Sequence, residues 1–190
     1  DLYQCHWPDP TSNLDDTMEA LLDLQRQGKI RAIGVSNFTP DMMRQFMQHG
    51  VLASDQPKYN PLERDAEQEI LPFCIENNVG VLAYSPLAMG LMTGKMTPDR
   101  EFKGDDTRKN RPWYSKKNRQ RVADMLEKVK PIADVHSATL GQVAINWVIS
   151  QKGITTALVG ARDEKQVEEN VGAVSFRLTD DEVAYIRRLV

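Results

Sequence analysis

Five groups of polar residues lie at or just after the end of a run of β-forming residues, and their types suit the handling of a small polar molecule. They are His6, Ser36-Asn37, Gln56, Tyr84-Ser85 and Gly160–Arg162. An imidazole exchanges a proton near neutral pH, and hydroxyl and amide groups orient a polar ligand by hydrogen bonding. If the ends of these runs meet in the fold, the sequence predicts a binding or catalytic site there.

The elements that would position these groups alternate along the whole chain. The predicted strands are Asp1–His6, Ile30–Ser36, Ser54–Tyr59, Val79–Tyr84 and Thr155–Val159. The predicted helices are Asp15–Gln27, Thr39–Gly50, Asp65–Asn77, Ser115–Val135, Leu140–Gln151, Asp163–Val171 and Thr179–Leu189. Strand-helix alternation of this kind predicts parallel strands joined by right-handed helical crossovers.

Parallel strands can form an open sheet or a closed barrel, and the position of the polar groups favours the barrel. In a (β/α) barrel the C-terminal ends of all strands share one rim, where active sites are built. A complete barrel has eight strands in about 250 residues, whereas this chain has 190 residues and five candidate strands. We therefore predict a single domain over residues 1–190 that is the C-terminal portion of a barrel.

The composition excludes several classes of function. The chain is 41% hydrophobic and has 24 Lys and Arg against 27 Asp and Glu, a formal net charge of −3. These values are typical of a globular protein and give no general attraction to nucleic acid or to an anionic membrane. No apolar run has the length of a membrane-spanning helix and no signal peptide is evident, so we expect a cytoplasmic protein. The sequence indicates no oligomeric state.

Some local patterns fail the requirements of the sites they suggest. Gly90–Lys95 resembles a phosphate-binding P-loop, but Met96 stands where Ser or Thr is required. Cys5 and His6 are not a metal-binding pair, because adjacent strand residues face opposite sides. The basic stretch Arg108–Arg119 is short, and we expect a solvated loop. No GxGxxG motif occurs, which excludes cofactor binding of the Rossmann type.

Several segments, taken together and in order, resemble the aldo-keto reductases, which are nicotinamide-dependent enzymes on a (β/α) barrel. They are Asp1–Pro8, Ile33–Phe38, Gln56–Asn60, Ala83–Gly90 with Gly94-Lys95, and Gly160–Arg162 with Gln166 and Glu169-Asn170. The resemblance covers essentially the whole chain. It is strongest to the group that contains bacterial stress-protein reductases and potassium-channel β-subunits. It implies a (β/α)8 TIM barrel of which this chain supplies the last five βα segments, the three N-terminal strands being absent.

The resemblance implies that His6 takes part in catalysis. Leu2, Gln4 and His6 share one side of their strand, so His6 is expected at the rim, pointing inward. In the family this residue donates a hydrogen bond that orients the substrate carbonyl and stabilises the oxyanion as hydride arrives. Trp7 could line the substrate pocket. The alternatives are a buried structural histidine and an ordinary packing tryptophan.

The resemblance also implies an NADP(H) site at the strand ends. Ser36, Asn37 and Gln56 would hold the nicotinamide carboxamide, and Tyr84 would stack on the nicotinamide ring. Without the family motif, Ser36 and Asn37 could be ordinary turn residues and Tyr84 a core aromatic.

The phosphate and adenine contacts are expected from two later segments. The residues expected along the pyrophosphate are Ser85, Pro86, Leu87, Ala88, Gly90, Thr93 and Lys95, with Arg108 nominated to close over the phosphates. Gly160 and Arg162 precede a helix that carries Gln166, Glu169 and Asn170. Arg162 would bind the adenosine 2′-phosphate, which favours NADP over NAD, and Glu169 and Asn170 would contact adenine. A solvated helix with ordinary polar pairs is the alternative.

The implied reaction is NADPH-dependent reduction of small aldehydes or ketones to alcohols by direct hydride transfer. The family's general-acid Tyr, its Lys and its Asp come from segments N-terminal to this chain, so only His6 of the four reacting residues is present. We therefore predict that the sequence is a portion of a longer reductase and that the 190-residue chain alone is inactive. The alternative is a regulatory subunit that binds the cofactor on the same fold without significant turnover.

Overall fold

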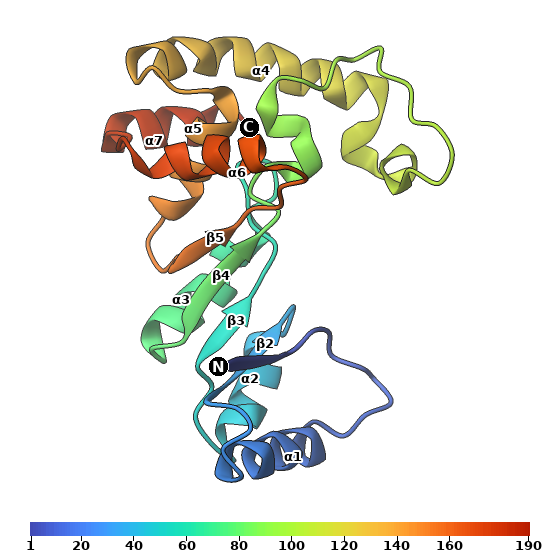
Figure 1. The fold of residues 1–190 in the computed structure, drawn as a ribbon, viewed down its shortest axis with the longest axis vertical. Helices are drawn as coiled ribbons and strands as arrows, with labels where there is room; N and C mark the ends of the chain where they lie inside the picture. Colours follow the sequence, from blue (N-terminus) through green and yellow to red (C-terminus); the bar gives the residue numbers. More distant parts are fainter. The chain divides into compact units, whose positions relative to one another are not determined.

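The computed structural model, which describes all of residues 1–190, contains a five-stranded parallel sheet. The strands are β1 (Leu2–Cys5), β2 (Ala32–Ser36), β3 (Ser54–Gln56), β4 (Gly80–Tyr84) and β5 (Thr156–Leu158). They lie in the order β1-β2-β3-β4-β5, so each strand pairs with the strand that follows it in the sequence (Figure 1). The predicted parallel strands with helical crossovers are confirmed.

The chain divides into two compact units. The first unit consists of residues 1–59, 63–84 and 151–158, and it contains all five strands. The second unit consists of residues 60–62, 85–150 and 159–190, and most of it is helical. Whether residues 1–190 behave as one domain therefore stays a prediction.

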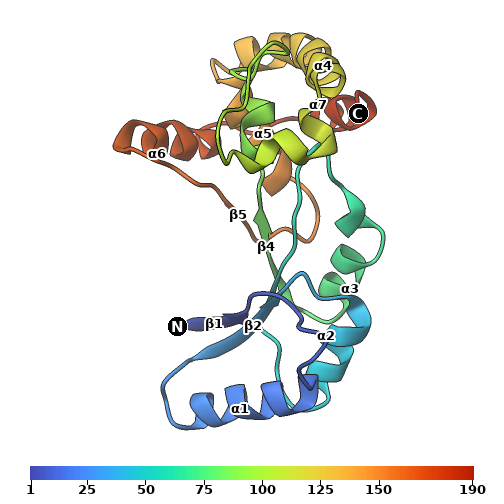
Figure 2. The same cartoon turned by 90° about the vertical axis from the view of Figure 1, so that its right-hand side faces the viewer.

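Helices α1 (Leu14–Arg26), α2 (Pro40–Met47) and α3 (Ile70–Glu76) belong to the first unit, where α1 and α2 pack together (Figure 2). Thr39 caps α2 by accepting a hydrogen bond from the N–H of Met42, and Pro40 occupies the first turn, as the sequence indicated. The core of this unit is apolar and includes side chains with no exposed area, among them Met18, Ile33, Val35, Met43, Phe46 and Val81.

The second unit contains four helices: α4 (Lys116–Val135), α5 (Leu140–Ile149), α6 (Glu164–Val171) and α7 (Asp180–Arg188). Thr179 and Glu182 form the predicted capping box at the start of α7, and Thr139 and Gln142 form a second one at α5. Short 3₁₀ turns at residues 88–93, 107–110 and 112–114 connect β4 to α4. Leu91, Met92, Val122, Leu126 and Ala144 belong to the buried apolar core of this unit.

Several predicted elements are shorter in the structure than expected, and proline explains two of these differences. The predicted helix Asp65–Asn77 is a 3₁₀ turn at Asp65–Glu67 followed by a new helix from Ile70. Because proline lacks an N–H and disrupts a helix interior, restarting at Ile70 places Pro72 in the first turn, where no N–H is needed. Likewise β3 ends at Gln56 rather than Tyr59, since Pro57 cannot donate to the ladder. No helix in the structure is long and apolar enough to cross a membrane.

Candidate functional site

His6 directly follows β1, and its side chain is exposed. Its backbone carbonyl accepts a hydrogen bond of 3.3 Å from Nδ2 of Asn37, so the chain after β1 is fastened to the chain after β2. The neighbouring Trp7 is also exposed, with its ring centroid 6.3 Å from that of His6. The structure thus places His6 at the end of β1, and its role in catalysis stays a prediction.

Asn37 is the centre of a hydrogen-bond network at the C-terminal ends of β2, β3 and β4. Its Nδ2 donates to Oγ of Ser36 at 2.9 Å, and its Oδ1 accepts from the hydroxyl of Tyr84 at 2.9 Å. Ser36 Oγ in turn donates to the backbone carbonyl of Gln56 at 2.7 Å. Asn37 adopts a left-handed backbone (φ 61°), which asparagine tolerates better than most residues. The structure thus joins four of the predicted nicotinamide-binding residues in one network.

Gln4 extends this network to β1, and the sequence did not single it out as a site residue. Nε2 of Gln56 donates to Oε1 of Gln4 at 3.1 Å, and Nε2 of Gln4 donates to the carbonyl of Val35 at 3.1 Å. The alternation that placed Gln4 on the same side as His6 was the available signal. Gly34 makes room for these contacts, because a Cβ atom there would lie 2.4 Å from Oγ of Ser54.

The segment after β4 has an unusual backbone and lies in the second unit. Ser85 (φ 58°), Ala88 (46°), Met89 (49°) and Gly90 (98°) are all left-handed. Such conformations cost free energy in residues other than glycine and collect at functional sites. At Gly90 and at Gly94 (φ 71°) this conformation carries no such cost, because glycine has no Cβ atom. The segment is a series of tight turns, and no α-helix follows it as in a P-loop.

Hydrogen bonds from outside the segment hold these turns in place. Nδ2 of Asn60 donates to the carbonyl of Ser85 at 3.1 Å, and the hydroxyl of Tyr114 donates to the carbonyl of Ala88 at 2.7 Å. Within the segment, Oγ1 of Thr93 donates to the carbonyl of Gly90 at 2.8 Å. Asn60 and Tyr114 were not predicted as site residues. Each of them bonds to a residue that lies 25 or 26 positions away in the chain, and the sequence carries no local signal for such a contact.

The N-terminus of α6 gathers most of the residues predicted around the adenosine. Asp163 caps the helix, and Oε1 of Gln166 accepts from the N–H of Arg162 at 3.1 Å. Nδ2 of Asn170 donates to the carbonyl of Gly160 at 3.4 Å. Arg162 is exposed, and the hydrogen bond that it donates comes from its backbone N–H and leaves its guanidinium without a hydrogen-bond or ion-pair partner. This turn therefore presents an exposed guanidinium beside a helix N-terminus whose dipole favours anions, and the carboxylate of Asp163 already caps that N-terminus.

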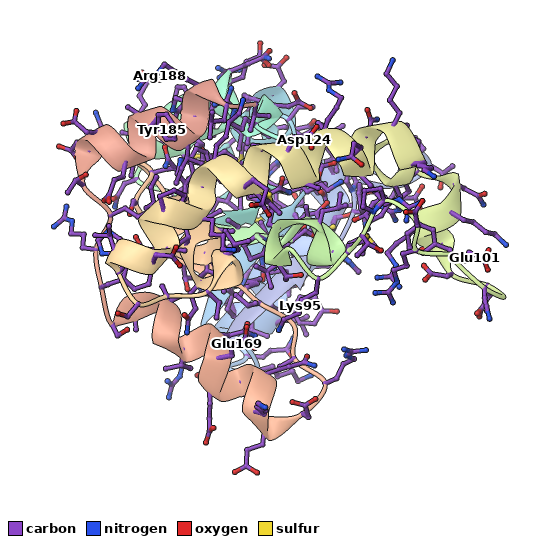
Figure 3. The ribbon with its side chains drawn as sticks, turned by 90° about the horizontal axis from the view of Figure 1, so that it is seen from above. Lys95, Glu101, Asp124, Glu169, Tyr185 and Arg188 are labelled. Atoms are coloured by element: carbon purple, nitrogen blue, oxygen red, sulfur yellow. The ribbon has the colours of Figure 1, made fainter.

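Lys95 and Glu169 link the segment after β4 to α6 within the second unit. Nζ of Lys95 lies 3.3 Å from both carboxylate oxygens of Glu169, and the two side chains meet in Figure 3. Lys95 is exposed and Glu169 is half-buried. The two predicted contact residues therefore also contact each other, and because Lys95 is exposed to solvent the ion pair adds little to stability.

Arg108 is separate from these groups. Its guanidinium forms a two-point ion pair with Asp106, with Nε to Oδ1 at 2.8 Å, and this hydrogen bonding lowers the pKa of Asp106 to about 2. It also lies 5.3 Å from the centre of the Phe102 ring. The prediction that residues 108–119 form a solvated loop is wrong at two positions. Tyr114 is buried, and Arg119 is 7% exposed and donates to the carbonyls of Thr97 and Arg100.

Comparison with known proteins gives the family. A sequence model described as "Aldo/keto reductase family" matches residues 1–190. The chain belongs to the aldo/keto reductase family. It is 36% identical over 192 residues to the NADH-specific methylglyoxal reductase of Escherichia coli, a match that covers 100% of this chain and 58% of that protein. It is 38% identical over 169 residues to an aldo-keto reductase of Bacillus subtilis, covering 88% of this chain and 51% of that protein.

The solved structures confirm the predicted fold class. The glycerol dehydrogenase of Gluconobacter oxydans superimposes with a TM-score of 0.94 at 38% identity, covering 100% of this chain and 57% of that one. A thermostable aldo-keto reductase gives a TM-score of 0.78 at 28% identity. The five parallel strands are thus the last five βα units of an aldo/keto reductase barrel. The chain spans slightly more than half the length of these relatives, and the narrower grouping within the family stays a prediction.

Proposed function

We propose that this chain forms the cofactor-binding part of a nicotinamide-dependent oxidoreductase that reduces small aldehydes or ketones, with NADPH as the preferred cofactor. The observation that carries the proposal is the network of Ser36, Asn37, Gln56 and Tyr84 at the strand ends. Its hydroxyl and amide groups match the donors and acceptors of a carboxamide, and the membership of the family supplies the reaction class. The bound cofactor would supply a hydride.

The residues of this chain would hold and orient the reactants. Asn37 and Gln56 would fix the carboxamide and so determine which face of the nicotinamide ring meets the substrate, while the hydrogen bond to Asn37 orients the ring of Tyr84. The exposed imidazole of His6 would donate a hydrogen bond to the substrate carbonyl and stabilise negative charge on its oxygen. Trp7 would contact the substrate. A positioned general acid is also needed, and we propose that a segment N-terminal to this chain supplies it in the intact protein.

Arg162 supports the choice of NADPH. Its guanidinium is exposed and has no partner, and it stands beside the N-terminus of α6, where an anion is favoured. A 2′-phosphate bound there would form a charge-assisted hydrogen bond, worth about 1.5–3 kcal/mol. The relative from Escherichia coli is named as an NADH-specific enzyme. The preference of this protein for NADPH over NADH is therefore the part of the proposal that most needs a test.

Cofactor titration of the intact protein, expressed from its complete reading frame, tests the proposal. Arg162→Ala should weaken NADPH binding about ten-fold or more and NADH binding less than two-fold, because only NADPH has the phosphate. Lys165→Ala is the matched control, because it removes an exposed positive charge from the same helix. It should leave the affinities for NADPH and for NADH unchanged. Equal losses of both cofactors in Arg162→Ala would contradict the phosphate contact.

Turnover distinguishes an enzyme from a regulator. His6→Ala should lower kcat on small aldehydes about 100-fold while changing the cofactor dissociation constant little, since the imidazole acts on the substrate oxygen. An unchanged kcat in His6→Ala would show that His6 has no catalytic role. Tight cofactor binding by the wild type without turnover on any aldehyde or ketone would favour the regulatory subunit, and absence of cofactor binding would refute both functions.

A further inference from the structure

β3 carries a carboxylic acid that none of the roles above uses. Asp55 has no exposed area, and it lies in one row of the sheet between Val35 and Val81, which are also fully buried. Its neighbours Ser54 and Gln56 point to the opposite face, because side chains alternate along a strand. Asp55 therefore lies in the apolar layer between the sheet and its helices, directly behind the network that contains Gln56.

No hydrogen-bond donor in good geometry reaches either carboxylate oxygen of Asp55. An unpaired buried charge is costly, so the group is expected to keep its proton. Burial raises the pKa of Asp55 to about 7, and the backbone N–H groups of Gln56 and Phe38 offset part of that effect. Near neutral pH the folded protein therefore contains both the neutral and the charged form.

The surroundings of Asp55 offer no cation to balance its charge. Cys74 of α3 is also buried, and burial together with the charge of Asp55 raises the pKa of its thiol to about 12. The remaining ionisable side chains on β4, α2 and α3 are exposed or bonded elsewhere: Tyr84, Asp41, Arg44 and Glu76. β2 has none. A charged Asp55 can be stabilised only if water or its backbone neighbours move toward it.

Of the two backbone groups near Asp55, one belongs to the proposed nicotinamide site and the other directly follows it in the chain. Phe38 directly follows Asn37, whose backbone is left-handed, and Gln56 is itself a member of the network. The turn after β2 and the end of β3 are thus the backbone segments next to the carboxylate, and an opening that brings water in on their side would displace one of them. Either movement would disturb the side chains of Asn37 and Gln56.

We propose that Asp55 is a positioning residue for Ser36, Asn37 and Gln56, and that loss of its proton weakens cofactor binding as the pH rises through neutrality. The inference rests on the proposed cofactor site and adds a regulation of that site by pH. It assigns a role to a residue that would contact neither cofactor nor substrate. The neutral acid leaves the turn after β2 closed, and the charged form favours its open state.

Fluorescence titration with NADPH and NADH between pH 5.5 and 8.5 tests the inference on the intact protein. In the wild type, affinity for both cofactors should fall about five-fold or more from pH 6 to pH 8. In Asp55→Asn the change should be absent, because the amide has no proton to lose in this range. Both cofactors are needed, since a phosphomonoester itself titrates near pH 6. A slope that persists in Asp55→Asn would overturn the proposal.

Two further measurements separate this inference from the proposed function. His6→Gln should keep the pH dependence, whereas its loss in that variant would assign the effect to the imidazole and overturn the proposal. In the ligand-free wild type, the carboxyl ¹³C signal of Asp55 should titrate near neutrality and the Phe38 amide should lose exchange protection over the same range. A carboxyl that titrates below pH 5 would overturn the role of Asp55 even if Asp55→Asn does not fold. Failure of both cofactors to bind at any pH would refute the proposed function and, with it, any effect of Asp55 on cofactor binding. Cofactor binding that does not change between pH 6 and pH 8 would refute the inference alone.

Discussion

Replacing Asp55 with asparagine should change how the stability of the protein depends on pH. The folded state holds this carboxyl at a pKa of about 7 against an ordinary value of 3.8, because burial disfavours its charge. Between these two values the folded state binds more protons than the unfolded state, so stability falls as the pH rises. The penalty is absent below pH 4, accumulates up to about pH 7 and is constant above it.

The size of the penalty follows from the shift. Roughly 3 pKa units at 1.36 kcal/mol each give about 4 kcal/mol. The amide of Asp55→Asn is also buried without partners, which costs about 1–3 kcal/mol at every pH. The absolute stabilities of the two proteins can therefore be similar, and the diagnostic quantity is the difference in slope.

Urea denaturation at a series of pH values from 4.5 to 8.5 measures that difference. The free energy of unfolding of Asp55→Asn, relative to the wild type, should increase by about 3 kcal/mol between pH 4.5 and about pH 7 and stay constant from there to pH 8.5. Asp105→Asn, a change at an exposed carboxylate, is the control and should follow the wild type. Parallel curves for the wild type and Asp55→Asn would show that the carboxyl is hydrated or paired in solution, and would refute the reasoning.

Two more substitutions test the packing and the capping. Gly34→Ala places a Cβ atom 2.4 Å from Oγ of Ser54 and should lower the free energy of unfolding, measured by urea denaturation, by about 1–3 kcal/mol. The double variant that also carries Ser54→Ala should recover part of this loss. An unchanged free energy of unfolding in Gly34→Ala would mean that the strands separate easily here. Thr139→Ala removes the capping box of α5 and should cost about 1 kcal/mol, whereas Thr139→Ser should retain most of the stability. Equal losses in the Ala and Ser variants would contradict the capping role.

The sequence predicted the parts of this structure that depend on local chemistry. The capping box at Thr179, the N-cap at Thr39 and the strand-end positions of Ser36 and Tyr84 follow from residue type and spacing alone. The parallel order of the strands follows from the alternation of strands and helices. The family was predicted from the combination of motifs, each of which is weak by itself.

The parts that the sequence did not predict depend on contacts between distant residues. Gln4 and Gln56 are 52 residues apart, and Arg119 reaches the carbonyl of Thr97 across 22 residues. Asp55 was not singled out, because an aspartate beside a glutamine at a strand end looks like another polar rim residue. Alternation along the strand puts Asp55 opposite Gln56, but only the structure shows that this side is fully buried and offers its carboxylate no side-chain partner.

The strand order has a consequence for the way the chain reaches its structure. The first four strands each pair with a neighbour a short distance along the chain, as in the contact of Gln4 with Val35 across 31 residues. β5 joins β4 only after a much longer excursion, marked by the bond from Val81 to Thr155 across 74 residues. The longer closure costs about 0.8 kcal/mol more in chain entropy. As a ribosome releases the chain from its N-terminus, β1 to β4 can pair while residues beyond them are still being made, and β5 must dock last.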